Sequence, residues 1–184
     1  MSATEADADQ LERNKEVVRQ VVEKIWNQRD IDAADYLIAE NSYDHDLGFD
    51  EQGGRAGFKQ HVPDLWAGSS DLHLDIEFMI AERDLVAARV VWTGIHDGPM
   101  LGVPASYNRV EFRQLIVYRI ENGMVAEIWK AGDVLGLLEE MGVPSPNRTT
   151  PLGMVKFVGK MIGRETYRGI RKKLTGSPVK RPET

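Results

Sequence analysis

The sequence contains no cysteine. This absence excludes disulfides, a thiol nucleophile and thiolate metal ligands, and it is compatible with a reducing compartment. The sequence also lacks an apolar run of the roughly 20 residues that a membrane-spanning helix needs. Its polar, acidic N-terminus has no apolar segment of the kind found in secretory signals. We therefore expect a soluble, cytoplasmic protein with one domain and an extension.

Several common site motifs are missing as well. The sequence has neither of the glycine-rich phosphate loops, GxGxxG and GxxxxGK, and no HExxH metal motif. His45 with Asp44 or Asp46 supplies two metal ligands in sequence, which is too few for a metal site. We therefore predict that the protein uses no metal and no cofactor.

Charge is unevenly distributed over a chain whose net charge is −6. Residues 148–184 carry ten Lys or Arg and two Asp or Glu, so the rest of the chain is strongly acidic. An acidic body does not suit nucleic-acid binding, which needs clustered cations. The basic extension has apolar residues at helical spacing and could lie on an anionic membrane surface. Within the helical spacing, Gly153, Gly159, Gly163 and Gly169 each cost about 1 kcal/mol relative to alanine, so packing against protein is favoured.

Apolar periodicity predicts helices first and strands afterwards. Helical spacing runs from Leu11 to Trp26, and shorter helices are expected over residues 31–39 and 55–67. Alternation then predicts strands over residues 72–80, 85–97, 107–120 and 124–130, with a hairpin turn at 121–123. Asp133 is placed to cap a final short helix that ends at Gly142. This order predicts an α+β fold with helices on one face of a curved antiparallel sheet.

These elements carry short motifs whose order and spacing resemble the SnoaL-like polyketide cyclases. That family shares a cone-shaped α+β fold with nuclear transport factor 2 and ketosteroid isomerase. The matching features are Trp26; Tyr43, His45 and Asp46; Gly94, His96 and Gly98; the loop 102–104; the strand 109–113; Gly123, Glu127 and Trp129; and the helix start 133–138. The resemblance implies a cone domain over residues 11–143, between a disordered acidic N-terminus (1–10) and a partly helical extension (144–184).

The resemblance also implies an activity. In these cyclases a pocket acid moves protons during ring closure of an aromatic polyketide ester, without a metal or cofactor. That acid follows the tryptophan of the Glu-x-Trp strand, where this sequence has Lys130. Two histidines near the acid correspond here to Ile128 and Ile116. The first hypothesis is therefore an acid–base enzyme acting on a cyclic or polyketide-like molecule. The second is a binding protein that kept the pocket and lost the acid.

Four residues are candidates for catalysis: His45, His96, Asp133 and Lys130. Histidine titrates near neutrality, which suits His45 and His96 for proton transfer. Asp133 is explained by capping alone, although a capped carboxylate could also face a ligand. Burial would make Lys130 a base or a Schiff-base nucleophile, but a strand-end lysine with its ammonium in water is favoured. His61 receives no role.

Other residues are candidates for ligand binding or assembly. Pockets for small molecules are mainly apolar, and the aromatic and aliphatic candidates are Trp26, Tyr43, Trp66, Trp92, Phe112, Tyr118, Ile116 and Ile128. Along the strand 106–120, the face turned away from the core would carry Leu115 and Val117 inside a charged rim. Such a patch suits an isologous homodimer.

Overall fold

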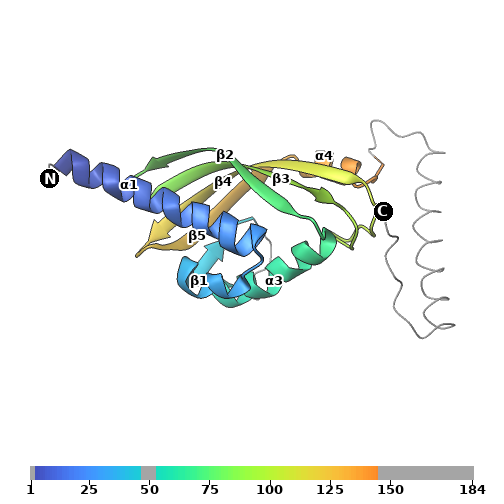
Figure 1. Cartoon of the computed structure of the whole chain (residues 1–184), viewed down its shortest axis with the longest axis horizontal. Helices are drawn as coiled ribbons and strands as arrows, with labels where there is room; N and C mark the ends of the chain where they lie inside the picture. The colour runs from blue at the N-terminus through green and yellow to red at the C-terminus, as the bar shows by residue number, and fades with distance from the viewer. Residues whose placement is uncertain (1–2, 47–52, 145–184) are drawn as a thin grey trace. The chain divides into compact units, whose positions relative to one another are not determined.

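The computed structural model describes residues 3–46 and 53–144 (Figure 1). The chain divides into two compact units, Met1–Met141 and Gly142–Thr184, and nearly all of the described residues belong to the first. The predictions for the basic extension fall almost entirely on residues 145–184, outside the described part of the chain. Within the described part, no helix is long and apolar enough to cross a membrane.

The first half of the fold is helical, as predicted. Helix α1 (Ala3–Gln20) runs into a π-helical segment (Val21–Asn27), a 3₁₀ turn (Ile31–Ala33) and the short helix α2 (Ala34–Leu37). Residues 3–10 were expected to be disordered, but they form the first turns of α1. The second predicted helix is shorter than expected, because the chain becomes extended at Ile38. Helix α3 (Gly54–Gly68) contains Pro63, as the sequence indicated.

The π-helical segment ends in a contact that fixes the helix to the sheet. The amide of Gln28 donates to the carbonyl of Glu23, five residues back, at 2.9 Å. At this widened turn the Asn27 side chain meets strand β2 (His73–Glu82). Its Nδ2 donates to the Leu74 carbonyl at 3.0 Å, and its Oδ1 accepts from the Leu74 amide at 2.9 Å. Since β2 is an edge strand, this one side chain satisfies backbone groups that would otherwise face solvent.

The sheet has five strands in the order β1-β5-β4-β3-β2. Strands β2, β3 (Leu85–Ile95), β4 (Arg109–Glu121) and β5 (Met124–Gly132) form an antiparallel meander, as predicted. Strand β1 (Ile38–Asp44) pairs with β5 in parallel. The prediction of a purely antiparallel sheet is therefore wrong at this edge, where β1 adds a strand outside the predicted run of strands. Helix α4 (Val134–Glu140) closes the unit.

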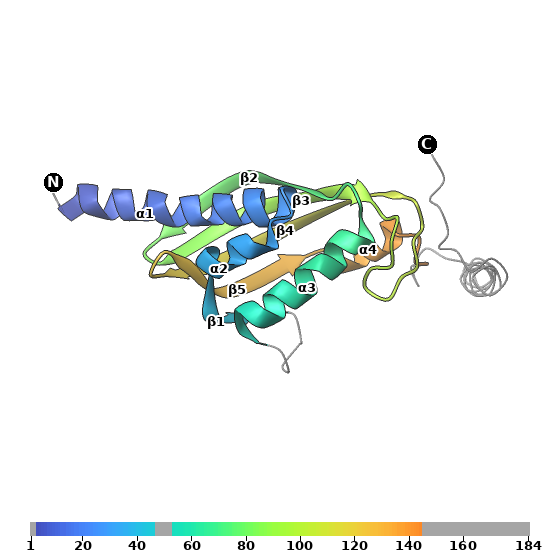
Figure 2. The same cartoon turned by 60° about the horizontal axis from the view of Figure 1, so that its bottom comes forward.

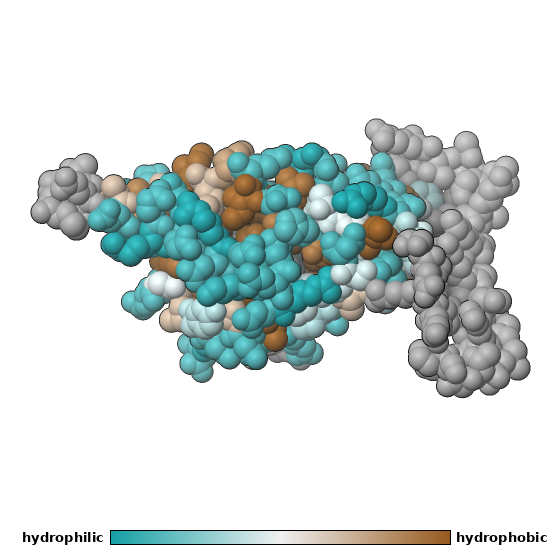
Figure 3. All heavy atoms as spheres, in the orientation of Figure 1, coloured by the Kyte–Doolittle hydropathy of each residue, from teal (hydrophilic) through white to brown (hydrophobic). Residues whose placement is uncertain are grey.

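The helices α1, α2 and α3 cover one face of the sheet, which we call the inner face (Figure 2). The buried core lies between them and includes Ile25, Val62, Val90, Ile116 and Tyr118. The opposite, outer face carries the alternate residues of each strand. Figure 3 views the unit from the side of α1, where hydrophobic side chains reach the surface in small groups among hydrophilic ones. Polar side chains that point to the inner face are therefore the candidates for a site.

Candidate active site

Strand register decides which residues share the inner face. On β5 the side chains of Ile128 and Lys130 point inward, and those of Glu127 and Trp129 point outward, because side chains alternate along a strand. Ile128 is buried in the core. The parallel partner β1 aligns Asp44 with Ile128 and Tyr43 with Glu127. Asp44 therefore joins Lys130 on the inner face, whereas Tyr43 lies on the outer face, against the prediction that it binds substrate.

Lys130 and Asp44 form an ion pair on the inner face. The Lys130 Nζ lies 2.5 Å from Asp44 Oδ2, and the two side chains are 20% and 18% exposed. The backbone amide of Lys130 also donates to the Asp46 carboxylate. These contacts tie the end of β1 to β5. The prediction that the Lys130 ammonium extends into water is therefore wrong, since a carboxylate from the neighbouring strand holds it.

His61 of α3 lies close enough to this ion pair for the charges of Lys130 and Asp44 to act on it, and the sequence analysis gave it no role. Burial lowers the pKa of His61 below its ordinary value of 6.5, and the positive charge of Lys130 lowers it further. The carboxylates of Asp64 and Asp44 act in the opposite direction. The imidazole is therefore neutral at pH 7 and can accept a proton. The sequence does predict that His61 faces inward. The spacing i, i+3, i+4, i+7, i+8 of one helix face is followed by Phe58, His61, Val62, Leu65 and Trp66.

Tyr118 of β4 supplies a phenol to the same face. It is opposite Ile128 in the sheet and only 3% exposed. Burial raises the pKa of Tyr118 well above its usual value, and the negative charge of Asp44 adds to this. The hydroxyl therefore stays protonated at every physiological pH and can only act as a hydrogen-bonding group. The inner face thus holds a polar cluster of Asp44, His61, Tyr118 and Lys130.

A row of aromatic rings extends from this cluster. Trp26 stands 6.4 Å from Phe58 and 4.9 Å from Trp92, measured between ring centroids, and Trp92 stands 6.4 Å from Phe112. Trp66 packs against the same core. The predicted ligand-binding residues other than Tyr43 therefore belong to the inner half of the fold, with Ile116 and Ile128 buried among them.

His45 is on the other side of the sheet. Its ring stacks on Trp129 with centroids 4.5 Å apart, and its Nε2 lies 2.8 Å from Glu127 Oε2. Arg119 donates to the second oxygen of the same carboxylate at 2.7 Å. All three neighbours project from the outer face. The prediction that His45 and His96 border one pocket is therefore wrong, because the alternation of β1 turns His45 away from the core.

His96 is buried just beyond the end of β3. Its side chain is inaccessible to solvent, and Nδ1 lies 3.1 Å from the Ser106 hydroxyl and 3.4 Å from the Ser106 amide. Because Nδ1 accepts from that amide, the proton of the neutral ring sits on Nε2. Burial lowers the pKa of His96, although the carbonyls of Val103 and Gly98 and the charge of Asp97 oppose the effect.

Asp133 serves as the cap of α4. Its carboxylate accepts from the backbone amide of Gly136 at 2.8 Å, and its residue is exposed. Gly136 allows this approach, since a Cβ at that position would lie 2.5 Å from Asp133 Oδ2. The cap accounts for the residue fully. Of the four predicted catalytic residues, the structure therefore places only Lys130 in the polar cluster.

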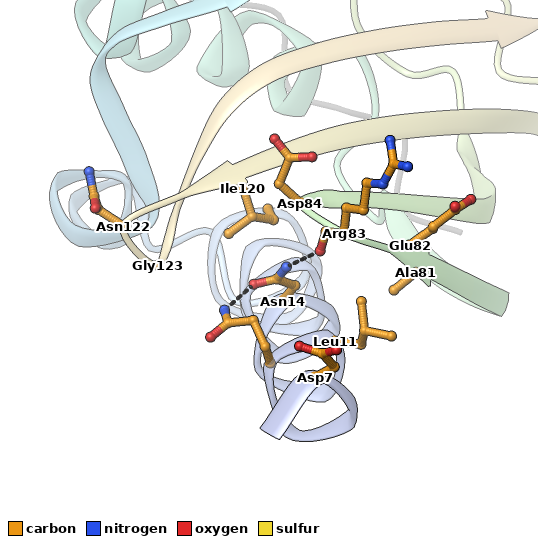
Figure 4. Close-up of a pocket in the computed structure, with 11 residues that line it drawn as sticks. Asp7, Leu11, Asn14, Ala81, Glu82, Arg83, Asp84, Ile120, Asn122 and Gly123 are labelled. Carbon is orange, nitrogen blue, oxygen red and sulfur yellow. Dashed lines mark hydrogen bonds between the residues drawn. The ribbon is translucent and has the colours of Figure 1, made fainter. Parts of the chain in front are cut away.

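A surface groove opens elsewhere on the unit, between α1 and the turns that join β2 to β3 and β4 to β5 (Figure 4). Its volume is about 520 Å³, and Asp7, Glu82 and Asp84 line it with Arg83. The Asn14 amide at its floor donates to the Arg83 carbonyl at 3.1 Å. No predicted site residue contributes to it. Within residues 3–46 and 53–144, no group of three or more histidines and carboxylates is arranged to hold a metal ion.

Comparison with known families supports the fold and its motifs. The sequence model described as "SnoaL-like polyketide cyclase" matches residues 16–141. This range contains every candidate residue discussed above. A search of curated proteins gives no significant match.

Solved structures give the same result for the architecture. TsrD from Streptomyces laurentii superposes with a TM-score of 0.65 at 24% identity, over 71% of this chain and 95% of that one. A candidate polyketide cyclase from Acidithiobacillus ferrooxidans gives 0.62 at 27%, over 71% and 94%. AclR from Streptomyces galilaeus, a candidate hydroxylase, gives 0.61 at 24%, over 73% and 99%. Two different activities are thus named among proteins of one architecture, so the reaction has to be inferred from the site.

Proposed function

Since the chain belongs to the SnoaL-like polyketide cyclase family, we propose that it is an enzyme that uses acid–base chemistry on a cyclic, largely apolar small molecule. The observation that supports this most directly is the neutral imidazole of His61 beside the Asp44–Lys130 ion pair. A base, a cation and a phenol thus share one partly buried face. Such groups are what proton transfer next to a carbonyl requires.

In the proposed reaction, His61 removes a proton from a carbon next to a substrate carbonyl. The electron pair of the broken C–H bond moves into the carbonyl and produces an enolate oxygen. The Lys130 ammonium stabilises that negative charge, and the Tyr118 hydroxyl can donate a hydrogen bond to it. For isomerisation or loss of water, protonated His61 returns the proton to carbon or to a leaving oxygen. For ring closure, the enolate carbon attacks a second carbonyl carbon of the same molecule, the electron pair of that C=O bond moves to its oxygen, and protonated His61 gives its proton to this oxygen. This cycle covers ring closure, isomerisation and loss of water, and it requires no metal or cofactor.

The Asp44 carboxylate has a supporting part in this proposal. The family resemblance implies an acid at the position of Lys130, on β5. Here the carboxylate comes from β1 instead and lies 2.5 Å from the lysine that replaced the acid. Asp44 holds the ammonium in one place and balances its charge. It also restores part of the proton affinity that Lys130 takes from His61.

A non-catalytic binding protein is the second candidate function. The observation in its favour is that Lys130 occupies the position of the family's acid and is already paired with Asp44. An ion-paired lysine is a poor proton donor and a poor nucleophile. On this alternative, the inner face would bind a similar ligand and release it unchanged.

The two candidates are separated by ligand capture followed by product analysis. A thermal-shift screen of polyketide, steroid and terpenoid compounds identifies ligands, since a compound at 100 times its Kd adds about 2.7 kcal/mol of stability. Each ligand is then incubated with wild-type protein and analysed by mass spectrometry and NMR. We expect at least one ligand to be converted, and conversion to be strongly reduced in Lys130→Met and Asp44→Asn. Recovery of every ligand unchanged would reject the enzyme and support the binding protein.

A further inference from the structure

Three buried polar atoms in the inner half of the fold lack a partner and have no part in the reaction above. They are Gln114 Oε1, Trp92 Nε1 and Trp66 Nε1, none of which has a hydrogen bond in the described structure. A buried polar group without a partner costs about 1–3 kcal/mol. Native proteins keep few such groups, so three of them around one ligand face call for a physical reason.

Two of these atoms belong to diagonal neighbours on adjacent strands. Trp92 of β3 is opposite Phe112 of β4, and Val90 is opposite Gln114. Trp92 and Gln114 therefore face the same side, with backbones about 7–8 Å apart as diagonal neighbours. The Phe112 ring neighbours Trp92 on this face, with ring centroids 6.4 Å apart. One group offers a hydrogen-bond donor and the other offers an acceptor.

The absence of a side chain at Gly132 leaves the space that the Gln114 side chain occupies. It is opposite Gln114 in the sheet, on the inner face of β5 and two residues beyond Lys130. A Cβ at this position would lie 2.7 Å from the Phe112 ring and 2.9 Å from Gln114 Cγ. The missing side chain therefore lets Gln114 and Phe112 lean over β5, on the side of Lys130. Gln114 thus lies on the same face as the aromatic row and opposite the end of the strand that carries Lys130.

We propose that Gln114 and Trp92 determine which ligand the inner face accepts. Gln114 Oε1 accepts a hydrogen bond from a ligand hydroxyl, and Trp92 Nε1 donates one to a ligand carbonyl. The ligand is a fused ring system of two or more rings that carries these groups on opposite edges. The inference rests on the proposed function only in taking the inner face as the ligand site. It concerns binding, so it holds whether or not the ligand is converted.

The two atoms without a partner would make the inner face reject ligands that cannot form hydrogen bonds with them. A hydroxy-ketone supplies both missing hydrogen bonds, whereas a ligand without the hydroxyl leaves Gln114 Oε1 buried without a partner. A site built around a hydrogen bond discriminates strongly against analogues that lack the group. In the ligand-free protein the same atoms only destabilise. Gln114 and Trp92 therefore lower stability in the free protein and provide selectivity when a ligand binds, which is typical of a functional site.

The test uses four small probes: 6-hydroxy-1-tetralone, 6-methoxy-1-tetralone, 1-tetralone, and 5,6,7,8-tetrahydro-2-naphthol, which keeps the hydroxyl and lacks the ketone. Their Kd values are measured by calorimetry on the full chain. We expect wild-type protein to bind the hydroxy-ketone about tenfold more tightly than the methoxy compound, which corresponds to one well-formed hydrogen bond. Gln114→Leu should reduce this ratio to below twofold. Trp92→Phe should instead remove the preference for the ketone over the naphthol.

Two controls keep a failure to fold from being mistaken for the expected result. Gln60→Leu makes the same change on the exposed side of α3 and should leave all four Kd values unchanged. Gln114→Leu removes an unpartnered buried atom, so its midpoint of thermal unfolding should equal or exceed that of wild type. The wild-type comparison of hydroxy and methoxy probes needs no variant at all.

Each outcome has one meaning. If wild-type protein binds the hydroxy and methoxy compounds equally, binds none of the four probes, or keeps its preference in Gln114→Leu, the inference is rejected. Selective binding without conversion would support the inference and count against the proposed enzyme. Conversion without selectivity would do the reverse.

Discussion

At the scale of single residues, His61 and His45 show how strand and helix geometry separate similar side chains. Both are histidines close to carboxylates, but His61 faces Lys130 and Asp44 on the inner face. His45 faces Glu127 and Trp129 on the outer face. Chemistry on an apolar substrate needs a group removed from bulk water, so the His61 imidazole is placed for catalysis and the His45 imidazole is not.

Replacing His61 by glutamine should therefore abolish turnover. Removal of a general base typically costs 10²–10⁴-fold in rate, and we expect kcat to fall within that range. His45→Gln is the matched control, for which kcat should change by less than about threefold, since His45 lies on the far side of the sheet. Steady-state kinetics on the converted ligand measure both. A loss of the same size in the two variants would contradict the assignment.

The pH profile provides a second check on His61. The base is active when neutral, and its pKa lies below 6.5 in the folded protein. Activity should therefore persist as pH falls through 6.5 and decline only at the lowered pKa. In Lys130→Met the positive charge that contributes to this lowering is gone, so the acid limb of kcat/KM should move to higher pH if activity remains measurable. An acid limb at or above pH 6.5 in wild-type protein would contradict the prediction.

His96 should affect stability. Its pKa in the folded state lies below that of the unfolded chain, so the unfolded chain binds more protons in the interval between the two values. The stabilisation is fully present above pH 6.5 and is lost as pH falls through the lowered pKa. Urea denaturation at a series of pH values should show the free energy of unfolding decreasing over that window. His96→Asn should make the decrease smaller, and an unchanged slope would count against a buried neutral imidazole.

At the scale of elements, the strands and most helices were predictable because each shows its own period. The strand predicted over residues 107–120 is β4, and the turn at 121–123 has positive φ at Asn122 and Gly123, as its sequence indicated. The parallel pairing of β1 was not predictable, since periodicity does not reveal which strand is the neighbour. The polar cluster was missed for the same reason: Asp44 meets Lys130 only through that pairing.

The contact of the π-helical segment with β2 should contribute measurably to stability. Asn27 makes two part-buried hydrogen bonds to Leu74, and each hydrogen bond contributes about 0.5–1.5 kcal/mol net. Asn27→Ala should lower the free energy of unfolding by about 2 kcal/mol. Asn27→Asp keeps the acceptor for the Leu74 amide and should lose less. Chemical denaturation of the three proteins measures the difference, and equal stability of Asn27→Ala and wild type would reject a structural role.

At the scale of the whole molecule, the outer face of the sheet is the candidate surface for assembly. Leu115 is 41% exposed on β4. Around it, the ion pairs of Arg113 with Glu111 and of Arg89 with Glu77 form a charged border. An apolar centre with a polar rim is typical of protein interfaces. The homodimer expected from the sequence therefore remains a proposal, and the exposure of this patch in the described unit supports it.

Sedimentation equilibrium tests the dimer directly. We expect wild-type protein to be dimeric at micromolar concentration and Leu115→Arg to be monomeric, because a charge would be buried at the centre of an isologous contact. Tyr36→Lys is the control: Tyr36 is 50% exposed on α2, on the helical side of the sheet, and its replacement should leave the dimer intact. A monomeric wild-type protein would reject the proposal.

The parallel pairing of β1 with β5 also bears on the order in which the protein folds. The meander from β2 to β5 pairs strands that follow one another in the chain, through two tight turns and the loop 96–108. The contact of Asp44 with Lys130, in contrast, spans 86 positions. Closing so long a loop costs more chain entropy than forming a hairpin, so β1 should dock after the meander has formed. The base, the cation and its carboxylate would then come together only in the last step, and a folding intermediate with four paired strands would carry nearly the whole sheet and no catalytic capacity.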